Sequence, residues 1–527
     1  MITGKNYIGN VLSSIGKNTF KTFNPQLNKE NKVVHTEASL IEIEKAVELA
    51  EEAFFSYKKV LGLEKSKFLL EIANEIENLG DELLDTYVNE SGLTKERAMV
   101  ERTRTIFQLQ SFAELVKKGD WVEASIDTGN EDRKPNPKPD IRKMLVPIGP
   151  IVVFGASNFP LAYSTAGGDT ASALASGCPV IVKSHPMHAG TGELVASAII
   201  KAAETTGMPN GVFSNLNSKG IEVGETLVKH PKVKAVGFTG SFKGGRALYD
   251  LASQREEPIP VFAEMGSVNP VIILPNAVKH KSTFWAKQYA SSIALGSGQF
   301  CTNPGLILGI KSNSLTKFIR NLGEEIIKIE PSCMLHPTII GAYEKQSNEA
   351  KLEEGVTTVA IQNKEVLKNY GKQIIVTVEG ETFLQNKKLH QEVFGPFSIV
   401  VQCENKAQLT KIIRNLEGQL TGTIISEGDD AVEFENSIEL LKNKVGRLIF
   451  NGVSTGVEVC NSMVHGGPYP ASTDSRFTAV GVNSIKRWVR PFSYQNWPNN
   501  LLPSELKNEN PLQISREING EKTMAKI

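Results

Sequence analysis

The sequence has none of the features that mark secreted, membrane-spanning or nucleic-acid-binding proteins. Its 527 residues contain no run of about 18 apolar residues, so no transmembrane helix is expected. The N-terminus lacks the long apolar segment of a secretory signal. Lys plus Arg and Asp plus Glu number 58 each, and this balance provides no field for nucleic acid or for a membrane surface. We therefore expect a cytoplasmic protein with no nucleic-acid partner and no membrane partner.

Cysteine is scarce, and its spacing excludes two structural roles. The five cysteines are Cys178, Cys301, Cys333, Cys403 and Cys460. They are odd in number and widely separated, and none forms a CxxC pair or lies with histidine at ligand spacing. We therefore predict neither a disulfide framework nor a metal site.

One cysteine stands in a context that favours chemistry. Cys301 follows an apolar segment of small residues, in Gly298-Gln299-Phe300-Cys301-Thr302. A thiolate is a strong nucleophile once its pKa is lowered, although a cysteine taken alone is more often a small buried hydrophobe. The interpretation of Cys301 therefore depends on the residues that accompany it.

Short apolar runs alternate with helical patterns along most of the chain. Hydrophobic residues make up 40% and charged residues 22%, which is ordinary for a globular enzyme, and the length exceeds what one core accommodates. Strands are predicted near 151–154, 180–182, 211–213 and 235–238, and a second series near 269–274, 305–310, 373–378, 398–402, 419–425 and 446–450. Helices are predicted from Ser39, as a capping box, and over 162–175, 190–206 and 221–229. This alternation predicts an α/β fold with two doubly wound domains, whose ligands bind beyond the carboxyl ends of the strands.

The predicted domain boundaries follow the two strand series. Residues 1–265 form N-terminal helices and a nucleotide-binding domain, interrupted by a polar, proline-containing excursion from 119 to 138. Residues 266–455 form a second domain that carries Cys301, and 456–497 return to the first. The polar tail, 498–527, is expected to pack loosely.

Three polar residues are candidates to assist Cys301. Asn158 follows a tight turn after a strand, and its amide could donate to an oxyanion, although asparagine is common in turns for its backbone tolerance. Glu264 is a carboxylate between apolar residues, which suits a general base, but an isolated buried glutamate is more often in a salt bridge. Glu392 is a second carboxylate beside an aromatic residue. Taken singly, the structural role outweighs the catalytic one for each.

The candidate nucleotide site lies at two strand ends. Lys183 ends one strand and could bond ribose hydroxyls, although a solvated lysine is the commoner case. Gly240, Ser241 and Gly245 lie where another strand turns into a helix, a geometry that admits a pyrophosphate. Because the spacing is not GxGxxG, these glycines taken alone are more often ordinary turn residues.

Taken together, the motifs occur in the order found in aldehyde dehydrogenases, and from residue 4 to 497 the chain resembles that family. The motifs are Asn158-Phe159-Pro160, Lys183, Phe238-Thr239-Gly240-Ser241, Glu264-Met265-Gly266, Gly298-Gln299-Phe300-Cys301 and Glu392-Val393-Phe394-Gly395-Pro396. Further segments resemble the branch that contains 2-oxoglutarate semialdehyde dehydrogenases and NADP-dependent fatty aldehyde dehydrogenases. These segments are His185-Pro186, His465-Gly466-Gly467-Pro468-Tyr469-Pro470-Ala471 and Arg490-Pro491-Phe492-Ser493-Tyr494-Gln495-Asn496.

The resemblance implies oxidation of an aldehyde to an acid through a cysteine thioester, without a metal. Cys301 would attack the aldehyde, while the Asn158 amide and the Cys301 backbone N–H hold the oxyanion. After hydride transfer to a nicotinamide, Glu264 would activate the water that hydrolyses the thioester. The cofactor-binding residues implied are Lys183, Ser184, His185, Phe238, Gly240, Ser241, Gly245, Glu392 and Phe394.

The sequence slightly favours NADP over NAD, with dual use left open. NAD-preferring relatives often carry a glutamate three residues after the strand-end lysine, and Pro186 occupies that position here. An acid there would repel a 2′-phosphate. Lys219 could substitute for the arginine of NADP-using relatives, whereas Glu222 nearby is unfavourable.

The expected substrate is 2-oxoglutarate semialdehyde, whose carboxylate calls for a basic residue. Arg102 and Arg104 lie two apart on a helix, so only one of them could serve, and surface or interdomain ion pairs are an equal alternative. Phe159, Phe300 and Phe477 would form apolar walls, which medium- or long-chain aliphatic aldehydes would also suit. A coenzyme-A-acylating enzyme, a thiol esterase and a non-catalytic binding protein are more remote alternatives.

The resemblance also implies a small protruding β-arm near 120–148, completed by a late strand near 485–490. Such an arm would join subunits into a homodimer or a homotetramer.

Overall fold

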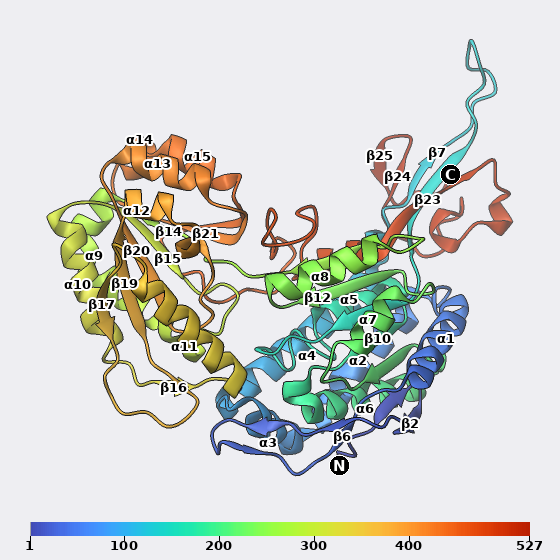
Figure 1. Cartoon of the computed structure of the whole chain (residues 1–527). Coiled ribbons are helices and arrows are strands. Elements are labelled where there is room, and N and C mark those ends of the chain that lie inside the picture. The colour runs from blue at the N-terminus through green and yellow to red at the C-terminus, as the bar shows by residue number, and fades with distance from the viewer. Residues whose placement is uncertain (1) are drawn as a thin grey trace.

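Two lobes, each built on a seven-stranded sheet, face each other across the molecule (Figure 1). The computed structural model describes residues 2–527. In the first sheet the strand order is β13-β12-β9-β10-β11-β1-β2. Its strands are β1 (Asn6–Ile8), β2 (Val11–Ser13), β9 (Ile151–Phe154), β10 (Val180–Lys183), β11 (Phe213–Leu216), β12 (Ala235–Thr239) and β13 (Val261–Glu264). The strands from β9 to β13 are parallel, and β1 and β2 extend the sheet antiparallel at one edge.

Helices cover both faces of the first sheet, and this explains why its strands are continuous apolar runs. Val152 packs with α1 (Leu40–Tyr57), α7 (Glu222–Lys229) and α8 (Phe242–Ser253), whereas its neighbours Ile151 and Val153 pack on the opposite face. The helices on that face are α2 (Gly62–Asn78), α3 (Gly80–Ser91), α4 (Lys95–Lys118), α5 (Gly168–Ser176) and α6 (Ala189–Thr205). Adjacent side chains of a strand point to opposite faces, so a strand buried on both sides has no polar positions to alternate.

The second lobe repeats this arrangement. The strand order is β17-β19-β20-β15-β14-β21-β22, with only the edge strand β17 antiparallel. Its strands are β14 (Val271–Ile273), β15 (Leu306–Ile310), β17 (Thr357–Ile361), β19 (Ile374–Glu379), β20 (Phe397–Cys403), β21 (Gln419–Ile425) and β22 (Val445–Phe450). One face packs on α9 (Pro275–Ala294) and α10 (Asn313–Ile326). The other packs on α11 (Pro337–Leu352), α12 (Gly380–Gln385), α13 (Lys406–Asn415) and α15 (Glu435–Lys442).

A third sheet forms an arm that projects from the first lobe at the upper right of Figure 1. Its strand order is β23-β8-β7-β24-β25, which brings together three distant parts of the chain. The strands are β7 (Ser125–Asp127), β8 (Ile141–Pro147), β23 (Val489–Gln495), β24 (Arg516–Ile518) and β25 (Glu521–Thr523). The late strand therefore begins at Val489, because residues 482–488 form a 3-10 helix instead of the strand expected there.

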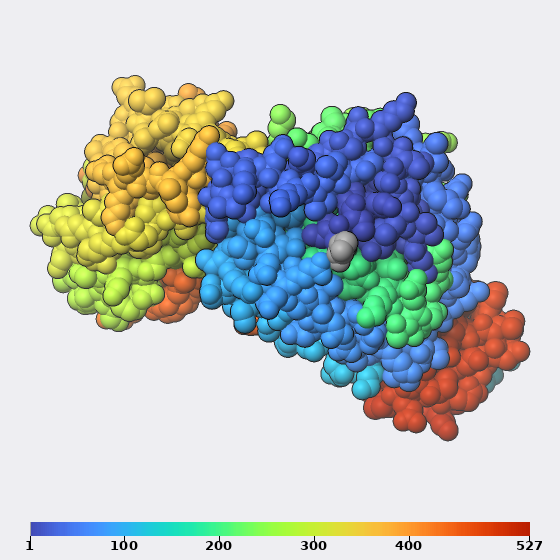
Figure 2. All heavy atoms as spheres, turned by 90° about the horizontal axis from the view of Figure 1, so that it is seen from below, coloured from blue at the N-terminus to red at the C-terminus, as the bar shows by residue number. Residues whose placement is uncertain are grey.

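The C-terminal tail is part of the arm, which corrects the expectation that it packs loosely. Leu502, Leu506 and Ile514 are buried against Ile126 and Met144. Arg142 of β8 donates to the backbone oxygen of Leu506 at 2.7 Å. The polar composition of the tail concealed this role, because only some of its apolar residues turn inward, while Leu501, Leu512, Met524 and Ile527 stay exposed. Seen from below, the tail, in red, covers one end of the molecule (Figure 2).

Other local differences from the sequence prediction concern where single elements begin. The capping box at Ser39 is present, but the helix predicted from residue 162 begins at Gly168, after a run of turns. The third strand begins at Phe213, since Gly211 has a φ of +90°. Residues 2–38 contain six short strands, and this segment wraps the underside of the first lobe in dark blue (Figure 2). Among residues 2–527, no helix combines the length and the apolarity needed to cross a bilayer.

Candidate active site

Cys301 lies on a strained loop that begins where α9 ends. Gly296, Ser297 and Gly298 have φ values of +55°, +55° and +65°. A side chain at Gly298 would lie 2.2 Å from the backbone oxygen of Gly395, so only glycine allows the loop to approach that segment so closely. The Asn269 amide donates to the backbone oxygen of Cys301 at 2.9 Å and so fixes the loop at the cysteine. The local strain is thus fixed by surrounding contacts, as is typical of functional loops.

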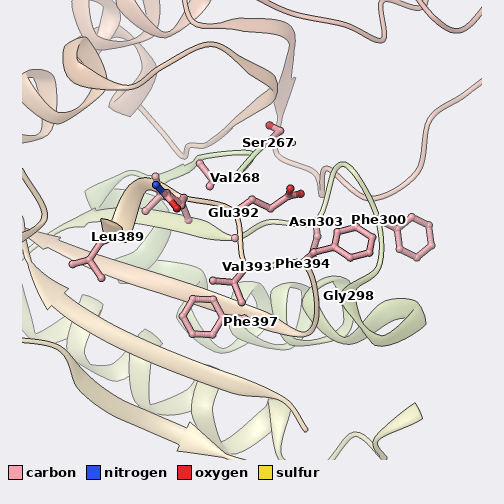
Figure 3. A pocket seen from close by; sticks show the side chains of 13 residues that line it. Ser267, Val268, Gly298, Phe300, Asn303, Leu389, Glu392, Val393, Phe394 and Phe397 are labelled. Atoms are coloured by element: carbon pink, nitrogen blue, oxygen red, sulfur yellow. The ribbon is translucent and has the colours of Figure 1, made fainter. Parts of the chain in front are cut away.

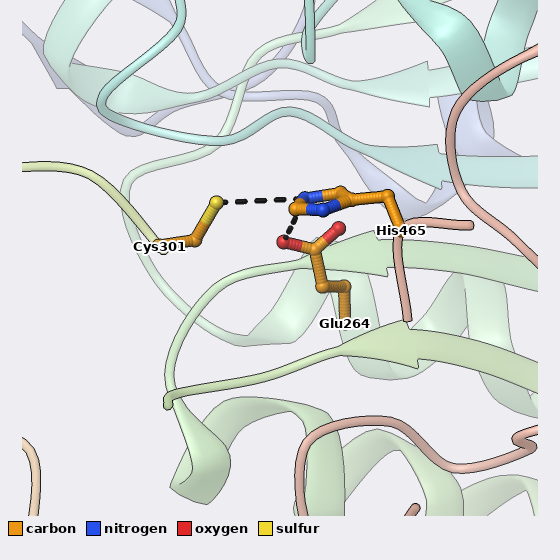
Figure 4. Close-up of side chains that lie close together, drawn as sticks. All are labelled: Glu264, Cys301 and His465. Carbon is orange, nitrogen blue, oxygen red and sulfur yellow. Dashed lines mark hydrogen bonds and ion pairs between the residues drawn. The ribbon is translucent and has the colours of Figure 1, made fainter. Parts of the chain in front are cut away.

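The Cys301 thiol faces a histidine and a carboxylate (Figure 4). Its Sγ lies 3.5 Å from Nε2 of His465, and the same Nε2 lies 2.9 Å from Oε1 of Glu264. His465 and Glu264 are almost fully buried. The His465–Glu264 contact is close but poorly aligned: within residues 2–527, neither carboxylate oxygen has a hydrogen-bond partner. The three side chains therefore form a buried cluster of nucleophile, imidazole and carboxylate.

The surroundings of Cys301 keep its thiol protonated at rest. Burial raises the pKa of the Cys301 thiol well above its usual range, and the carboxylates of Glu264 and Glu392 raise it further. Nucleophilic attack at neutral pH therefore needs a base within reach. His465 Nε2 is the nitrogen in contact with Sγ.

Sequence reasoning noted His465 only as part of a family motif and missed its position beside the thiol. Its backbone is fixed by Thr478, whose hydroxyl accepts from the His465 N–H at 2.9 Å, and by the N–H of Ala479. Glycines follow it, and a side chain at Gly467 would lie 2.2 Å from the backbone oxygen of Gln419. The turn is thus pressed against β21, and this directs the histidine inward.

The same cluster offers donors of the kinds that bind a metal ion. One atom each of Glu264, Cys301 and His465 lie within 4.8 Å of one another. Sulfur, imidazole and carboxylate ligands suit zinc. No spacing in the sequence signalled this set, because the three residues come from three separate segments.

Asn158 lies where an oxyanion donor is expected. Its side-chain nitrogen donates to the backbone oxygen of Gln299 at 3.0 Å, which places the amide beside the loop that carries Cys301. A side-chain amide nitrogen has two hydrogens, so one remains for another acceptor.

A cleft of about 320 Å³ opens beside the thiol and is bounded by both lobes. Predicted residues along it are Asn158, Gly240, Ser241, Glu264, Cys301, Glu392 and Phe394, and α11 supplies Thr338, Ile339, Ala342 and Gln346. Burial raises the pKa of Glu392 to about 7. A second, small cavity of about 10 Å³ adjoins the cleft at Glu392. There Glu392, Val393 and Phe394 face the loop of Gly298 and Phe300 (Figure 3).

Two predicted cofactor residues serve packing in this structure. The Phe238 ring contacts Phe154, with 6.1 Å between ring centroids, and covers Gly240. Gly245 is buried, and a side chain there would lie 2.7 Å from Met265, so this glycine lets α8 pack closely on β13.

The end of β10 presents polar groups that lack partners. The Lys183 ammonium donates no hydrogen bond and forms no ion pair within the described chain, and burial lowers its pKa to about 8 while the carboxylate of Glu37 opposes this shift. The buried Ser184 hydroxyl likewise has no partner among residues 2–527. His185 is uncharged at neutral pH, because burial lowers its pKa well below the usual range, and its ring stacks on His188.

Aromatic rings and arginines form the wall on the other side of the thiol. Phe159 and Phe300 meet edge to face at 5.5 Å, and the guanidinium of Arg97 lies 4.4 Å from the first ring and 4.8 Å from the second. Sequence reasoning missed Arg97. Phe477 is separate from this wall: it packs on Phe262 and lines a small hollow behind Glu264.

The expectation that Arg102 and Arg104 face different ways is confirmed. Arg102 pairs with Glu77 on α2 at 3.1 Å. Arg104 points toward the site, where it donates to the hydroxyl of Tyr163 at 3.4 Å and to the backbone oxygen of Val457.

Known proteins match this chain over almost its whole length. The aldehyde dehydrogenase family matches residues 12–478. Alpha-ketoglutaric semialdehyde dehydrogenase of Acinetobacter baylyi is 42% identical over 518 residues, which cover 98% of each chain. Alpha-ketoglutaric semialdehyde dehydrogenase 2 of Azospirillum brasilense is 43% identical over 522 residues, covering 98% of this chain and 99% of the relative.

The chain belongs to the aldehyde dehydrogenase family. Among solved structures, betaine aldehyde dehydrogenase of Staphylococcus aureus has the same fold, with a TM-score of 0.80 and 20% identity over 94% of this chain and 98% of that one. The predicted α/β fold class and the predicted family are thus confirmed. The site of this aldehyde dehydrogenase lies between its lobes, at the carboxyl ends of the parallel strands.

Proposed function

We propose that this aldehyde dehydrogenase oxidises 2-oxoglutarate semialdehyde (2,5-dioxopentanoate) to 2-oxoglutarate, with NAD(P) as cofactor. The contact of the Cys301 thiol with His465 and Glu264, inside a cleft between the lobes, carries the proposed chemistry. Two relatives named for this semialdehyde, each above 40% identity over nearly the whole chain, support the substrate.

The first step is attack of the thiol on the aldehyde carbon. Cys301 gives its proton to His465 Nε2, 3.5 Å away, and the Glu264 carboxylate stabilises the imidazolium. The Asn158 amide and the Cys301 backbone N–H hold the resulting oxyanion. Preorganised donors of this kind act where charge develops in the transition state.

The second half of the reaction hydrolyses the thioester on Cys301. The buried oxygens of Glu264, which lack aligned hydrogen bonds within residues 2–527, are acceptors ready to take a proton from water. Hydroxide then attacks the acyl carbon, the C–S bond breaks, and the acid leaves while the thiol is restored.

The residues present fit a dinucleotide. Lys183 and the buried Ser184 hydroxyl offer groups that find no partner in the described chain, and both stand at the end of β10. The N-terminus of α8, capped by Ser241, opens on the cleft and favours a phosphate. NAD(P) supplies the hydride acceptor when bound, and the betaine aldehyde dehydrogenase of similar fold was crystallised with NAD+. Glu392 and Phe394 stand beside Cys301 at the position suited to the nicotinamide end.

The carboxylate of the proposed substrate matches the arginines behind Tyr163. Arg104 and Arg447 both have a buried Nε atom without a partner among residues 2–527. Arg447 donates to the backbone oxygens of Ser454 and Gly456, the loop that also receives Arg104. Two cations in one desolvated wall favour a carboxylate over a neutral chain.

A substrate panel tests the proposed function. With NAD+ and NADP+ in parallel, kcat/KM for 2,5-dioxopentanoate should exceed that for aliphatic aldehydes of six to twelve carbons. Arg104→Met should raise KM for the dioxo acid and leave KM for the aliphatic aldehydes unchanged. Arg102→Met is the matched control. A preference for aliphatic aldehydes, which the Phe159 and Phe300 rings would favour, contradicts the proposed substrate but not the chemistry.

We further propose that the arm joins subunits. β23 is the edge strand of the arm sheet, and most of its side chains are exposed. An unpaired edge of this length is suited to strand addition by a second copy. A monomeric mass in light scattering would contradict this assignment.

A further inference from the structure

An acidic residue from the N-terminal segment stands beside the strand-end lysine. Glu37 lies just before α1, and its carboxylate accepts hydrogen bonds from the backbone N–H groups of Lys219 and Gly220, the latter at 2.9 Å. These two residues follow β11, whose Leu216 pairs with Lys183 of β10. Lys183 therefore stands at the carboxyl end of β10, and Glu37 is bound at the carboxyl end of the neighbouring β11. At this edge the first sheet is expected to bind its ligand.

The Glu37 carboxylate is held in place. One oxygen takes both backbone N–H groups, and the N–H of Ala38 donates to the backbone oxygen of Asn217 at 2.9 Å. The other oxygen of Glu37 accepts no hydrogen bond from the described residues. A fixed acceptor thus stands near the unpartnered ammonium of Lys183. The influence of Glu37 on the pKa of Lys183 agrees with this proximity.

A donor beside an acceptor matches the two neighbouring hydroxyls of a ribose. A hydroxyl can accept from an ammonium and donate to a carboxylate. A phosphate monoester on one of those hydroxyls cannot donate in the same way, and it brings about two negative charges toward the carboxylate.

We propose that Glu37 makes this enzyme select NAD over NADP by facing the adenosine ribose beside Lys183. The proposal rests on the proposed use of NAD(P). It reverses the preference expected from sequence, which followed from Pro186 standing where relatives carry an acid. The acid is present, but it reaches the site from a segment far earlier in the chain.

Of the other titratable groups around Glu37, the two histidines carry no charge. His336 is neutral at neutral pH, because burial and then Lys219 lower its pKa, and His185 is neutral for the reason given above. Lys183 and Lys219 remain as cations. Removing the charge of Glu37 alone therefore leaves two lysines that suit a 2′-phosphate.

Calorimetric titration of the full-length protein with NAD+ and with NADP+, without aldehyde, tests the proposal. The wild type should bind NAD+ about tenfold or more tightly than NADP+. Glu37→Gln keeps an acceptor for the backbone N–H groups and removes the charge, so it should tighten NADP+ and shift the ratio of the two Kd values by about tenfold or more. Glu225→Gln, which removes a carboxylate of α7 that pairs with Lys229 at 3.2 Å, should leave the ratio unchanged.

Tighter binding of NADP+ by the wild type, an unchanged ratio in Glu37→Gln, or an equal shift in Glu225→Gln would overturn the role of Glu37. If neither dinucleotide binds, the proposed function fails as well, so the two failures are distinguishable. A competition on the wild type needs no variant: 5′-AMP should displace NAD+ better than adenosine 2′,5′-bisphosphate does. The reverse order would also reject the proposal.

Discussion

Nε2 of His465 lies between the sulfur of Cys301, 3.5 Å away, and a carboxylate oxygen of Glu264, 2.9 Å away. One nitrogen thus contacts both the nucleophile and the acid of the site. Because burial disfavours the thiolate, the reactivity of Cys301 depends on a neighbour that accepts its proton.

Replacing this nitrogen should slow both the chemistry and the alkylation of the thiol. His465→Phe keeps a ring of similar size and removes the base, so kcat should fall by about 10²- to 10⁴-fold. The rate at which iodoacetamide modifies Cys301 at pH 7, followed by mass spectrometry, should fall with it. Phe477→Leu, on the neighbouring hollow, is the control, and an unchanged alkylation rate in His465→Phe would contradict the assigned base.

Loss of the Asn158 amide should act on the transition state. Asn158→Ala is expected to lower kcat by about 10²- to 10³-fold with little change in KM, because the ground-state carbonyl carries little charge. Steady-state kinetics measure the split. Nucleotide binding should not change, and a variant that loses affinity instead of turnover would identify Asn158 as a binding residue.

The buried carboxyl of Glu392 should make the unliganded enzyme less stable as the pH rises. Its pKa is raised by burial to about 7 in the folded state, above the ordinary value for a glutamate. The folded state therefore binds the proton more tightly than the unfolded state. The stability that the protonated carboxyl contributes is complete at pH 4 and is lost as the pH rises toward 7. The free energy of unfolding of Glu392→Gln, relative to that of the wild type, should rise by about 3 kcal/mol between pH 4.5 and pH 8. Urea midpoints at the two pH values measure this, and an equal difference at both would contradict it.

Zinc should inhibit by bridging the catalytic cluster. Glu264, Cys301 and His465 each offer one donor atom within a 4.8 Å set, and zinc favours such sulfur, imidazole and carboxylate ligands. We expect micromolar Zn²⁺ to stop turnover and EDTA to restore it. His465→Phe should weaken the inhibition measured against its own residual activity, whereas equal sensitivity would place the metal elsewhere.

The central strands of both sheets could be predicted because they are short apolar runs with both faces buried, whereas the edge strand β17, with exposed and half-buried side chains, was not predicted. β1 and β2 could not be predicted either, since they have only three residues each and join the sheet only through the pairing of β1 with β11, far along the chain. The reactive residues Cys301, Glu264 and Asn158 were recognised through a family pattern, and the structure brings them to one cleft.

The missed residues have a common cause. Glu37 and Arg97 come from segments that no local pattern marks, and His465 lies in a recognised motif whose sequence does not show that its ring meets the thiol. For Glu37, the contact that matters joins residues 182 apart in sequence. Charged and hydrogen-bonding partners so far apart in sequence can be identified only from the folded structure.

The arm also links the order of synthesis to assembly. β7 and β8 emerge early, whereas their partners β24 and β23 belong to the last part of the chain. During translation the pair β7–β8 has both outer edges unpaired until the rest of both lobes has been made. A nascent or prematurely terminated chain therefore exposes two unpaired strand edges that the finished chain covers with β23 and β24, and such edges favour aggregation.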